Sequence, residues 1–137
     1  MNNGFLTETE AAGILETFHN SIITQDFESW LELFSEDAIF EFPYAPEGYI
    51  KCLAGISEIR NYIYELPKLM NVHAFSNAEL IITNDKIVAE YTCDGVVIET
   101  QKPYQQTYIS VIHTKGGKIT RFKDYWNPVV VLNAVQN

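Results

Sequence analysis

The hydrophobic pattern of this chain changes near Val72 from a mainly helical repeat to a strand repeat. After that point four long segments are rich in β-branched and aromatic residues, and turn residues separate them. The turns are Asn84-Asp85, Lys102-Pro103 and Gly116-Gly117. Helices followed by consecutive strands are typical of an α+β protein, because a βαβ fold would alternate the two. The sequence therefore predicts an α+β fold with an antiparallel meander.

Three helices are predicted before the meander. Thr7 opens a capping box, and apolar residues follow it at helical spacing. Asp26 is a second N-cap, ahead of a short helix that is rich in aromatic residues. A third helix fits residues 57–66, and Pro67 is expected to stop it. A short strand over 37–42 lies between the second and third helices.

The last predicted strand raises a chemical question. It lies within residues 117–128, and alternation places Phe122, Asp124 and Trp126 on one face, with the basic residues on the other. The basic residues mark the wetter face, so a carboxylate lies between two large aromatics on the drier one. Asn127, directly after this strand, is expected to cap a short C-terminal helix.

Length and charge limit the function classes. The 137 residues suit a single domain over 1–137 with room for a core and a pocket. A net charge of −9 argues against nucleic acid and anionic membranes as partners, since both need clustered Lys and Arg. No apolar run reaches membrane-spanning length, and the first ten residues have no signal-peptide pattern. We therefore expect a cytoplasmic protein with two reduced cysteines.

Three stretches resemble a known fold family: "LFSEDAIFEFP", "PYQQTYISVIHTKGGKI" and "GKITRFKDYWNPVVVLNA". They are similar to the helix-to-strand passage, the penultimate strand and the final strand of the NTF2-like superfamily. The closest likeness is to its SnoaL-like branch, which includes the phenazine-biosynthesis A and B proteins and polyketide cyclases; ketosteroid isomerase is more distant. The resemblance implies a cone in which three N-terminal helices pack on a strongly curved antiparallel sheet around an internal pocket.

The resemblance also suggests catalytic residues. Asp124 matches a glutamate that transfers protons in the phenazine proteins. The alternatives are a cross-strand salt bridge, a hydrogen-bonded aspartate in the core, or a β-bulge that rotates the side chain outward. Gln106 is expected to orient a substrate carbonyl or hold Asp124, or simply to bond the backbone. Tyr62 stands where the phenazine proteins have a catalytic histidine, and a half-buried tyrosine at the pocket rim is the alternative. Phe42 replaces the aspartate base of steroid isomerases, so that reaction is not expected by that route.

Other residues are expected to shape the pocket, with an opening near residues 43–49. The expected lining is aromatic, although such side chains also fill ordinary cores: Trp30, Phe34, Phe42, Tyr62, Tyr108 and Trp126. His73 could face the pocket, but a lone histidine is more often structural. His19 and His113 are expected at the surface. No spacing of residues predicts a metal site or an organic cofactor.

Three functional hypotheses follow. The first is a SnoaL-like enzyme of isomerase, cyclase or lyase type, in which Asp124 transfers protons on a small cyclic or polyketide-like carbonyl compound. The second is a module that binds a small hydrophobic or aromatic molecule without turnover, and the third is a dimerisation domain with a collapsed pocket. In each case we expect a homodimer, because alternation gives the outer face of the sheet an apolar patch. The patch is predicted to contain Tyr91, Ile109, Val111 and Tyr125.

Overall fold

A computed structural model describes residues 6–136, so the first five residues, considered above for an export signal, lie outside it. The helices are α1 (Glu8–Thr24), α2 (Phe27–Leu31), α3 (Ile56–Leu69) and α4 (Pro128–Val135). The strands are β1 (Phe34–Glu41), β2 (Cys52–Ala54), β3 (Met70–Phe75), β4 (Glu79–Ile82), β5 (Lys86–Val97), β6 (Pro103–Lys115) and β7 (Lys118–Trp126). Helices therefore precede the long strands, and the predicted α+β class is confirmed.

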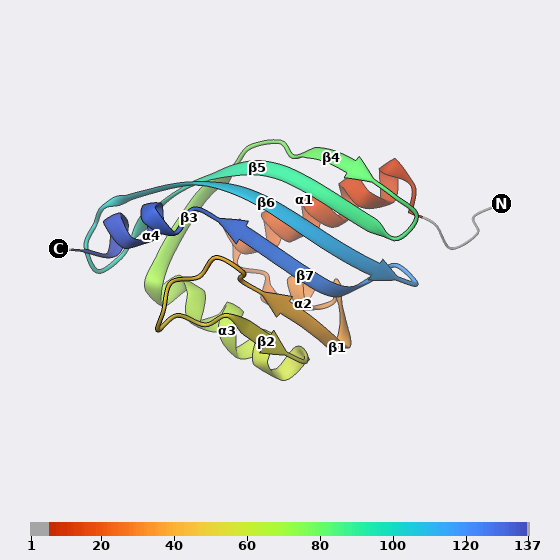
Figure 1. Cartoon of the computed structure of the whole chain (residues 1–137), viewed down its shortest axis with the longest axis horizontal. Helices are drawn as coiled ribbons and strands as arrows, with labels where there is room; N and C mark the ends of the chain where they lie inside the picture. The colour runs from red at the N-terminus through yellow and green to blue at the C-terminus, as the bar shows by residue number, and fades with distance from the viewer. Residues whose placement is uncertain (1–5, 137) are drawn as a thin grey trace.

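One curled sheet contains all the strands, in the order β2-β1-β7-β6-β5-β3, with β4 also paired to β5 (Figure 1). The helices α1, α2 and α3 pack on its concave side, and α4 lies at one end beside the β5–β6 turn (Figure 1). The predicted antiparallel sheet is confirmed for the long strands, and one pair departs from it, because β1 pairs with β7 in parallel. These strands are far apart in sequence, so no hairpin forces them to run in opposite directions.

Local sequence signals set most of the element boundaries. The Thr7 hydroxyl accepts the Glu10 N–H in a complete capping box, Asp26 caps α2, and Asn127 caps α4 as predicted. The expected stop at Pro67 is wrong, because α3 continues to Leu69 with the proline inside its last turn. Near the end of a helix a proline removes only one backbone hydrogen bond, so the last turn can still form around it.

Stacked aromatic rings join the helices to the sheet. Phe122 on β7 stacks between Phe18 of α1, with ring centroids 4.7 Å apart, and Phe40 of β1, at 4.5 Å. Trp30 of α2 packs on Phe34, and both are buried in the same cluster. This cluster fixes the helices over the centre of the concave face and forms the wall beneath the candidate site.

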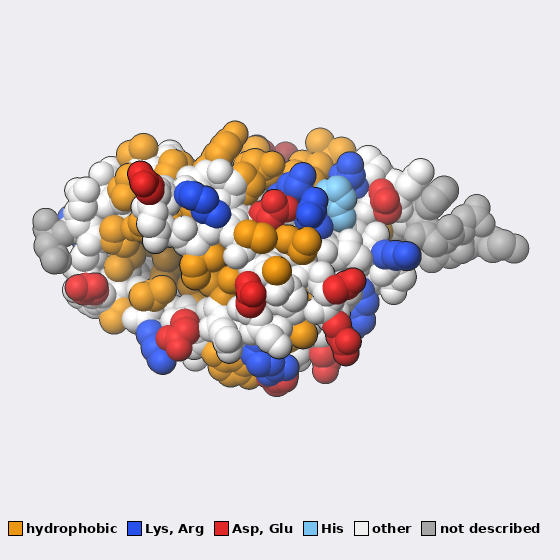
Figure 2. All heavy atoms as spheres, turned by 60° about the horizontal axis from the view of Figure 1, so that its bottom comes forward, with side chains coloured by type: hydrophobic (Ala, Val, Ile, Leu, Met, Phe, Trp, Pro, Cys, Tyr) orange, Lys and Arg blue, Asp and Glu red, His pale blue; other side chains and the backbone are white. Residues whose placement is uncertain are grey.

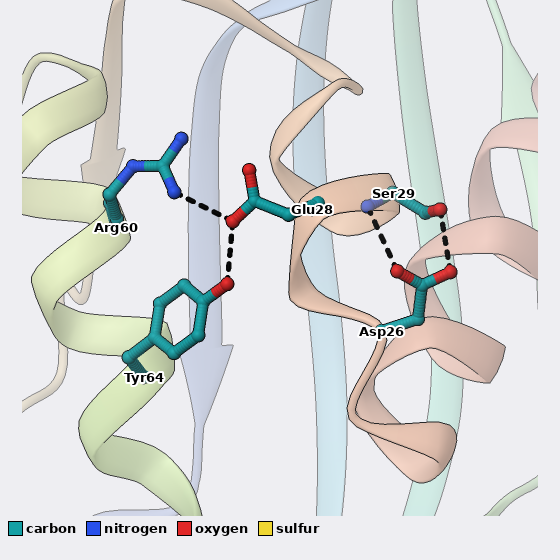
Figure 3. A network of polar contacts seen from close by, with 5 residues as sticks. All are labelled: Asp26, Glu28, Ser29, Arg60 and Tyr64. Atoms are coloured by element: carbon teal, nitrogen blue, oxygen red, sulfur yellow. Dashed lines mark hydrogen bonds and ion pairs between the residues drawn. The ribbon is translucent and has the colours of Figure 1, made fainter.

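A polar network at the surface joins α2 to α3 (Figure 3). The Glu28 carboxylate accepts a hydrogen bond of 2.6 Å from the Arg60 guanidinium and one of 2.5 Å from the Tyr64 hydroxyl. Both donors lower the pKa of Glu28, since they stabilise its charged form. The network holds the two helices side by side at the edge of the concave layer.

The outer face of the sheet differs from the prediction at one residue. Ile109 is 43% exposed, and Tyr125 lies opposite it on β7 and contacts the ring of Tyr44. Tyr91 is instead buried and faces inward, because the β5–β6 register pairs it with the inward-facing Tyr108. Alternation along β5 agrees with this, because Glu90 and Asp94 lie on the exposed face and Tyr91 shares the buried face with Ile87 and Ala89.

The expectation that His19 lies at the surface is also wrong. Its ring is buried on α1, stacked against Phe75 at 4.1 Å between centroids and edge-on to Tyr91 at 4.3 Å. Burial lowers the pKa of His19 to about 4, so the imidazole is neutral at ordinary pH. Thr17, Asn20 and Ser21 near it in the sequence are polar, but the rings that contact His19 come from the adjacent Phe18 and from β3 and β5.

Candidate functional site

A cavity of about 830 Å³ lies between the helices and the concave face of the sheet. Its walls include α1, α3, the loop around residues 48–50, the inner face of β5 to β7, and α4. In Figure 2 hydrophobic side chains surround a hollow on the left of the visible face, with acidic and basic side chains around it. The loop that was expected at the opening does contribute, through Gly48, Tyr49 and Ile50.

Most of the predicted pocket residues line this cavity: Trp30, Phe42, Tyr62, Tyr108, Asp124 and Trp126. Three predicted residues do not. Phe34 packs beneath Trp30 and against Phe122 in the core, because β1 begins at Phe34 and turns its ring toward the helices. The other two are His73 and Gln106, and each is placed by a feature that alternation does not show.

His73 is exposed rather than turned toward the cavity. The β3–β5 pairing shifts register between Val72 and Ala74, so His73 is the extra residue of a bulge. A bulge breaks the alternation of side chains along a strand, which is why the prediction failed here. The close approach of β3 to β5 at this point also requires Gly95, where an added Cβ would lie 2.5 Å from the Asn71 carbonyl oxygen.

Gln106 is buried and faces inward, but its side-chain amide forms hydrogen bonds with the backbone of Asn127. Its Nε2 donates to the Asn127 carbonyl at 3.0 Å and to the Tyr104 hydroxyl at 3.2 Å. Its Oε1 accepts the Asn127 N–H at 3.0 Å. Gln106 therefore fastens the start of α4 to the sheet, and the structure shows no hydrogen bond from it to Asp124.

Asp124 lies on β7 directly opposite Ser110 on β6. The Ser110 hydroxyl donates a hydrogen bond of 3.3 Å to the Asp124 carboxyl. A second bond of 2.6 Å joins the Ser110 hydroxyl to the Tyr91 hydroxyl. The three side chains form a continuous polar chain on an otherwise apolar wall, and it positions the carboxyl at the cavity surface.

Sequence reasoning missed Ser110 and Tyr91 as members of this group. The signal for Ser110 was present, because it continues the inward alternation of Tyr104, Gln106 and Tyr108 on β6. The signal for Tyr91 was also present, because it continues the inward alternation of Ile87 and Ala89 on β5.

Burial raises the pKa of Asp124 from 3.8 to about 7, and the Ser110 hydrogen bond only partly offsets this. No Lys, Arg or His among residues 6–136 forms an ion pair with this carboxyl. The carboxyl can therefore exchange a proton near neutral pH, as an acid–base group must. This arrangement differs from the salt bridge that was one alternative for Asp124.

Hydroxyl groups surround the carboxyl and stay protonated. Burial raises the pKa of Tyr62, Tyr91, Tyr104 and Tyr108 above the ordinary tyrosine value, for Tyr104 to about 12. The Tyr104 and Tyr108 hydroxyls lie 3.2 Å apart. Such groups can donate hydrogen bonds to a ligand oxygen, but they do not titrate near pH 7.

Within the described range, no group of three or more His, Cys, Asp or Glu side chains is arranged to hold a metal ion. The described helices also include none that is both long and apolar enough to cross a membrane.

Comparison with known proteins gives consistent matches over most of the chain. The family model described as "SnoaL-like domain" matches residues 15–122. The protein YesE of Bacillus subtilis (strain 168) is 45% identical over 127 residues, which are 91% of this chain and 86% of YesE. The PhzA/B-like protein PA3332 of Pseudomonas aeruginosa is 33% identical over 112 residues, covering 80% of this chain and 79% of PA3332.

Solved structures agree with these matches. A crystal structure of a candidate isomerase from Bacillus subtilis has a TM-score of 0.88 at 45% identity, covering 94% of this chain and 95% of that chain. An NTF2-like protein also shares the fold, with a TM-score of 0.80 at 14% identity. A likeness at this low identity shows the fold alone. The predicted NTF2-like cone is therefore confirmed.

Proposed function

The chain belongs to the SnoaL-like domain family, and we propose that it is an enzyme that moves protons on a small cyclic or polyketide-like carbonyl compound. The observation that carries the proposal is the Asp124 carboxyl at the cavity wall, with a pKa near 7 and no cationic partner in the described residues. The reaction type would be that of an isomerase, cyclase or lyase without a cofactor. A largely apolar cavity with few polar groups suits such a substrate.

The proposed step starts from ionised Asp124. Its carboxylate takes a proton from the carbon next to the substrate carbonyl. The C–H electron pair forms a C=C bond to the carbonyl carbon, and the C=O π pair moves to the oxygen to give an enolate. Protonated tyrosine hydroxyls, such as those of Tyr62 and Tyr108, are available to donate hydrogen bonds to that oxygen. The protonated Asp124 then returns the proton to the same or another carbon.

Proton exchange in D₂O tests this proposal. A panel of cyclic ketones is incubated with the protein, and the loss of α-protons is followed by NMR. Asp124→Asn keeps the shape but cannot titrate, and it should slow the exchange of any accepted ketone by about 10²-fold or more. Glu28→Gln, which changes a carboxylate outside the cavity, should leave the rate unchanged. Equal rates in wild type and Asp124→Asn would refute the proposal.

A binding protein without turnover is the second candidate function. The observation that favours this function is the raised pKa of Tyr62. Because Tyr62 does not titrate near neutral pH, it cannot serve as a second acid–base group beside Asp124. The two functions differ in one result: a ligand that binds wild type and Asp124→Asn equally, with no proton exchange in either, indicates binding alone.

We also propose that the protein pairs with a second copy through the outer face of the sheet. Tyr44, Ile81 and Ile109 are exposed there or beside it, at 61%, 68% and 43%. A two-fold axis would bury the patch against itself. Light scattering at micromolar concentration should give about twice 15.7 kDa, and the monomer mass would contradict the pairing.

Residence in the cytoplasm stays a prediction.

A further inference from the structure

The cavity has two chemically different halves. One half contains Asp124 and is walled by aromatic rings, among them Trp30, Phe42 and Trp126. The other half lies at the end of the sheet near α4, where Cys93 and the ring of Tyr104 form part of the wall. The rest of this wall is aliphatic and consists of Met70, Val72, Val97 and Val131. We call this second half the aliphatic lobe. Phe75 and Tyr108 contact both hydrophobic clusters and lie where the halves meet.

The contacts between strands and helices fix the aliphatic lobe. Met70 pairs with Val97 across β3 and β5. Val131, on α4, packs into the same cluster. Gln106 fastens the start of α4 to the sheet through both backbone groups of Asn127, so this wall is held in place. Leu69 and Val135 lie at the rim, 64% and 40% exposed, and leave the lobe open to solvent.

The charges around the cavity disfavour an anionic ligand. Its described lining residues include four carboxylates, Glu58, Glu65, Glu99 and Asp124, and only one cation, Lys68. The Lys68 ammonium is already 3.0 Å from Glu65, so it is partly neutralised. A carboxylate or phosphate ligand would enter an acidic surrounding without a cation of its own.

We propose that the cavity binds a neutral, elongated amphipathic ligand, with a ring and its carbonyl group at Asp124 and an aliphatic extension in the lobe beside α4. This inference rests on the proposed function only in assigning the carbonyl end to Asp124. Burial of each additional methylene group is worth about 0.8 kcal/mol, which corresponds to about a fourfold gain in affinity. Chain length should therefore control affinity until the lobe is full.

The test uses 2-acylnaphthalenes whose acyl chains lengthen by single methylene groups from acetyl to octanoyl. Both tryptophans of the chain, Trp30 and Trp126, line the cavity, so quenching of intrinsic fluorescence reports binding. We expect the dissociation constant to fall about fourfold per methylene over the first additions. A probe of equal length that ends in a carboxylate should bind at least tenfold more weakly than its neutral counterpart.

Two variants locate the effect. Val131→Phe fills the lobe from α4, and Val135→Phe narrows it at the rim, where a larger side chain is tolerated more easily. Both should remove the gain with chain length while the acetyl probe binds as before. Val129→Phe is the control, since Val129 is 58% exposed on the same helix and does not line the cavity. Melting curves identify any variant that fails to fold.

The outcomes are separable. An unchanged gain with chain length in folded Val131→Phe and Val135→Phe, no gain in wild type, or tighter binding of the carboxylate probe would each overturn the inference. Repeating the series in Asp124→Asn separates it from the proposed function. Chain-length dependence in that variant supports the lobe even if proton exchange is absent in both proteins.

Discussion

Two carboxylates in this molecule have opposite environments. Glu28, at the surface between α2 and α3, accepts hydrogen bonds from Arg60 and Tyr64, and its pKa is lowered (Figure 3). Asp124, at the cavity wall, receives one bond of 3.3 Å from Ser110, and burial raises its pKa to about 7. The same functional group is therefore held charged in one region and left ready to exchange a proton in the other.

The difference in environment distinguishes a structural carboxylate from a functional one. Glu28 ties two helices together, and its charge strengthens the bonds that do so. A buried carboxyl without a cation costs free energy when it ionises, so Asp124 lowers the stability of the fold as pH rises from its unfolded pKa to its folded pKa. A cost of this kind is typical of a functional site.

The largest expected effect is on the pH dependence of stability. Between about pH 4 and pH 7, Asp124 keeps its proton in the folded chain but loses it when unfolded, so wild-type stability falls as pH rises and then levels off. The gap between 3.8 and about 7 corresponds to about 4 kcal/mol at most. Urea titrations of wild type and Asp124→Asn measure this effect. The difference between their free energies of unfolding, wild type minus variant, should fall by up to this amount from pH 4 to pH 8. A constant difference would contradict the raised pKa.

A smaller effect is expected from Ser110→Ala. The variant removes the donor that partly offsets burial, so the pKa of Asp124 should rise further, by about one pH unit or less. NMR titration of the Asp124 carboxyl measures this directly. Thr107→Ala, at an exposed position on the same strand, should cause no change. A lower Asp124 pKa in Ser110→Ala would show that the bond does not favour the charged form.

The smallest effect is expected from Glu28→Gln, because exposed ion pairs contribute little. The melting temperature should stay within about 2 °C of wild type at neutral pH. The sign of its pH dependence is opposite to that of Asp124: the contribution of Glu28 is present above its unfolded pKa and is lost as pH falls through the lowered folded value. A large loss of stability at pH 7 would mean that the surface network matters more than this comparison allows.

Local signals in the sequence predicted much of this architecture. The caps at Thr7, Asp26 and Asn127 depend on neighbouring residues, and each forms as expected. The position of Asp124 between Phe122 and Trp126 followed from alternation along the part of β7 that lies beyond the register shift between Ile119 and Arg121, and both Asp124 and Trp126 line the cavity. These features need no information from distant parts of the chain.

Features that depend on distant parts of the chain were not predictable. The direction of His73 follows from a bulge against β5. His19 is buried by rings from β3 and β5, and Gln106 is committed to the backbone of Asn127 at the start of α4. In each case tertiary contacts decided where a side chain with an ambiguous pattern would lie.

The central claim is that Asp124 is an acid–base group whose pKa is raised by burial in the cavity wall. Its most direct test is an NMR titration of the Asp124 carboxyl in the wild-type protein, with the signal assigned by its absence in Asp124→Asn. We expect a midpoint near pH 7. A pKa at or below the model-peptide value of about 3.9 would mean that the carboxyl is solvated or ion-paired, and would contradict the catalytic assignment.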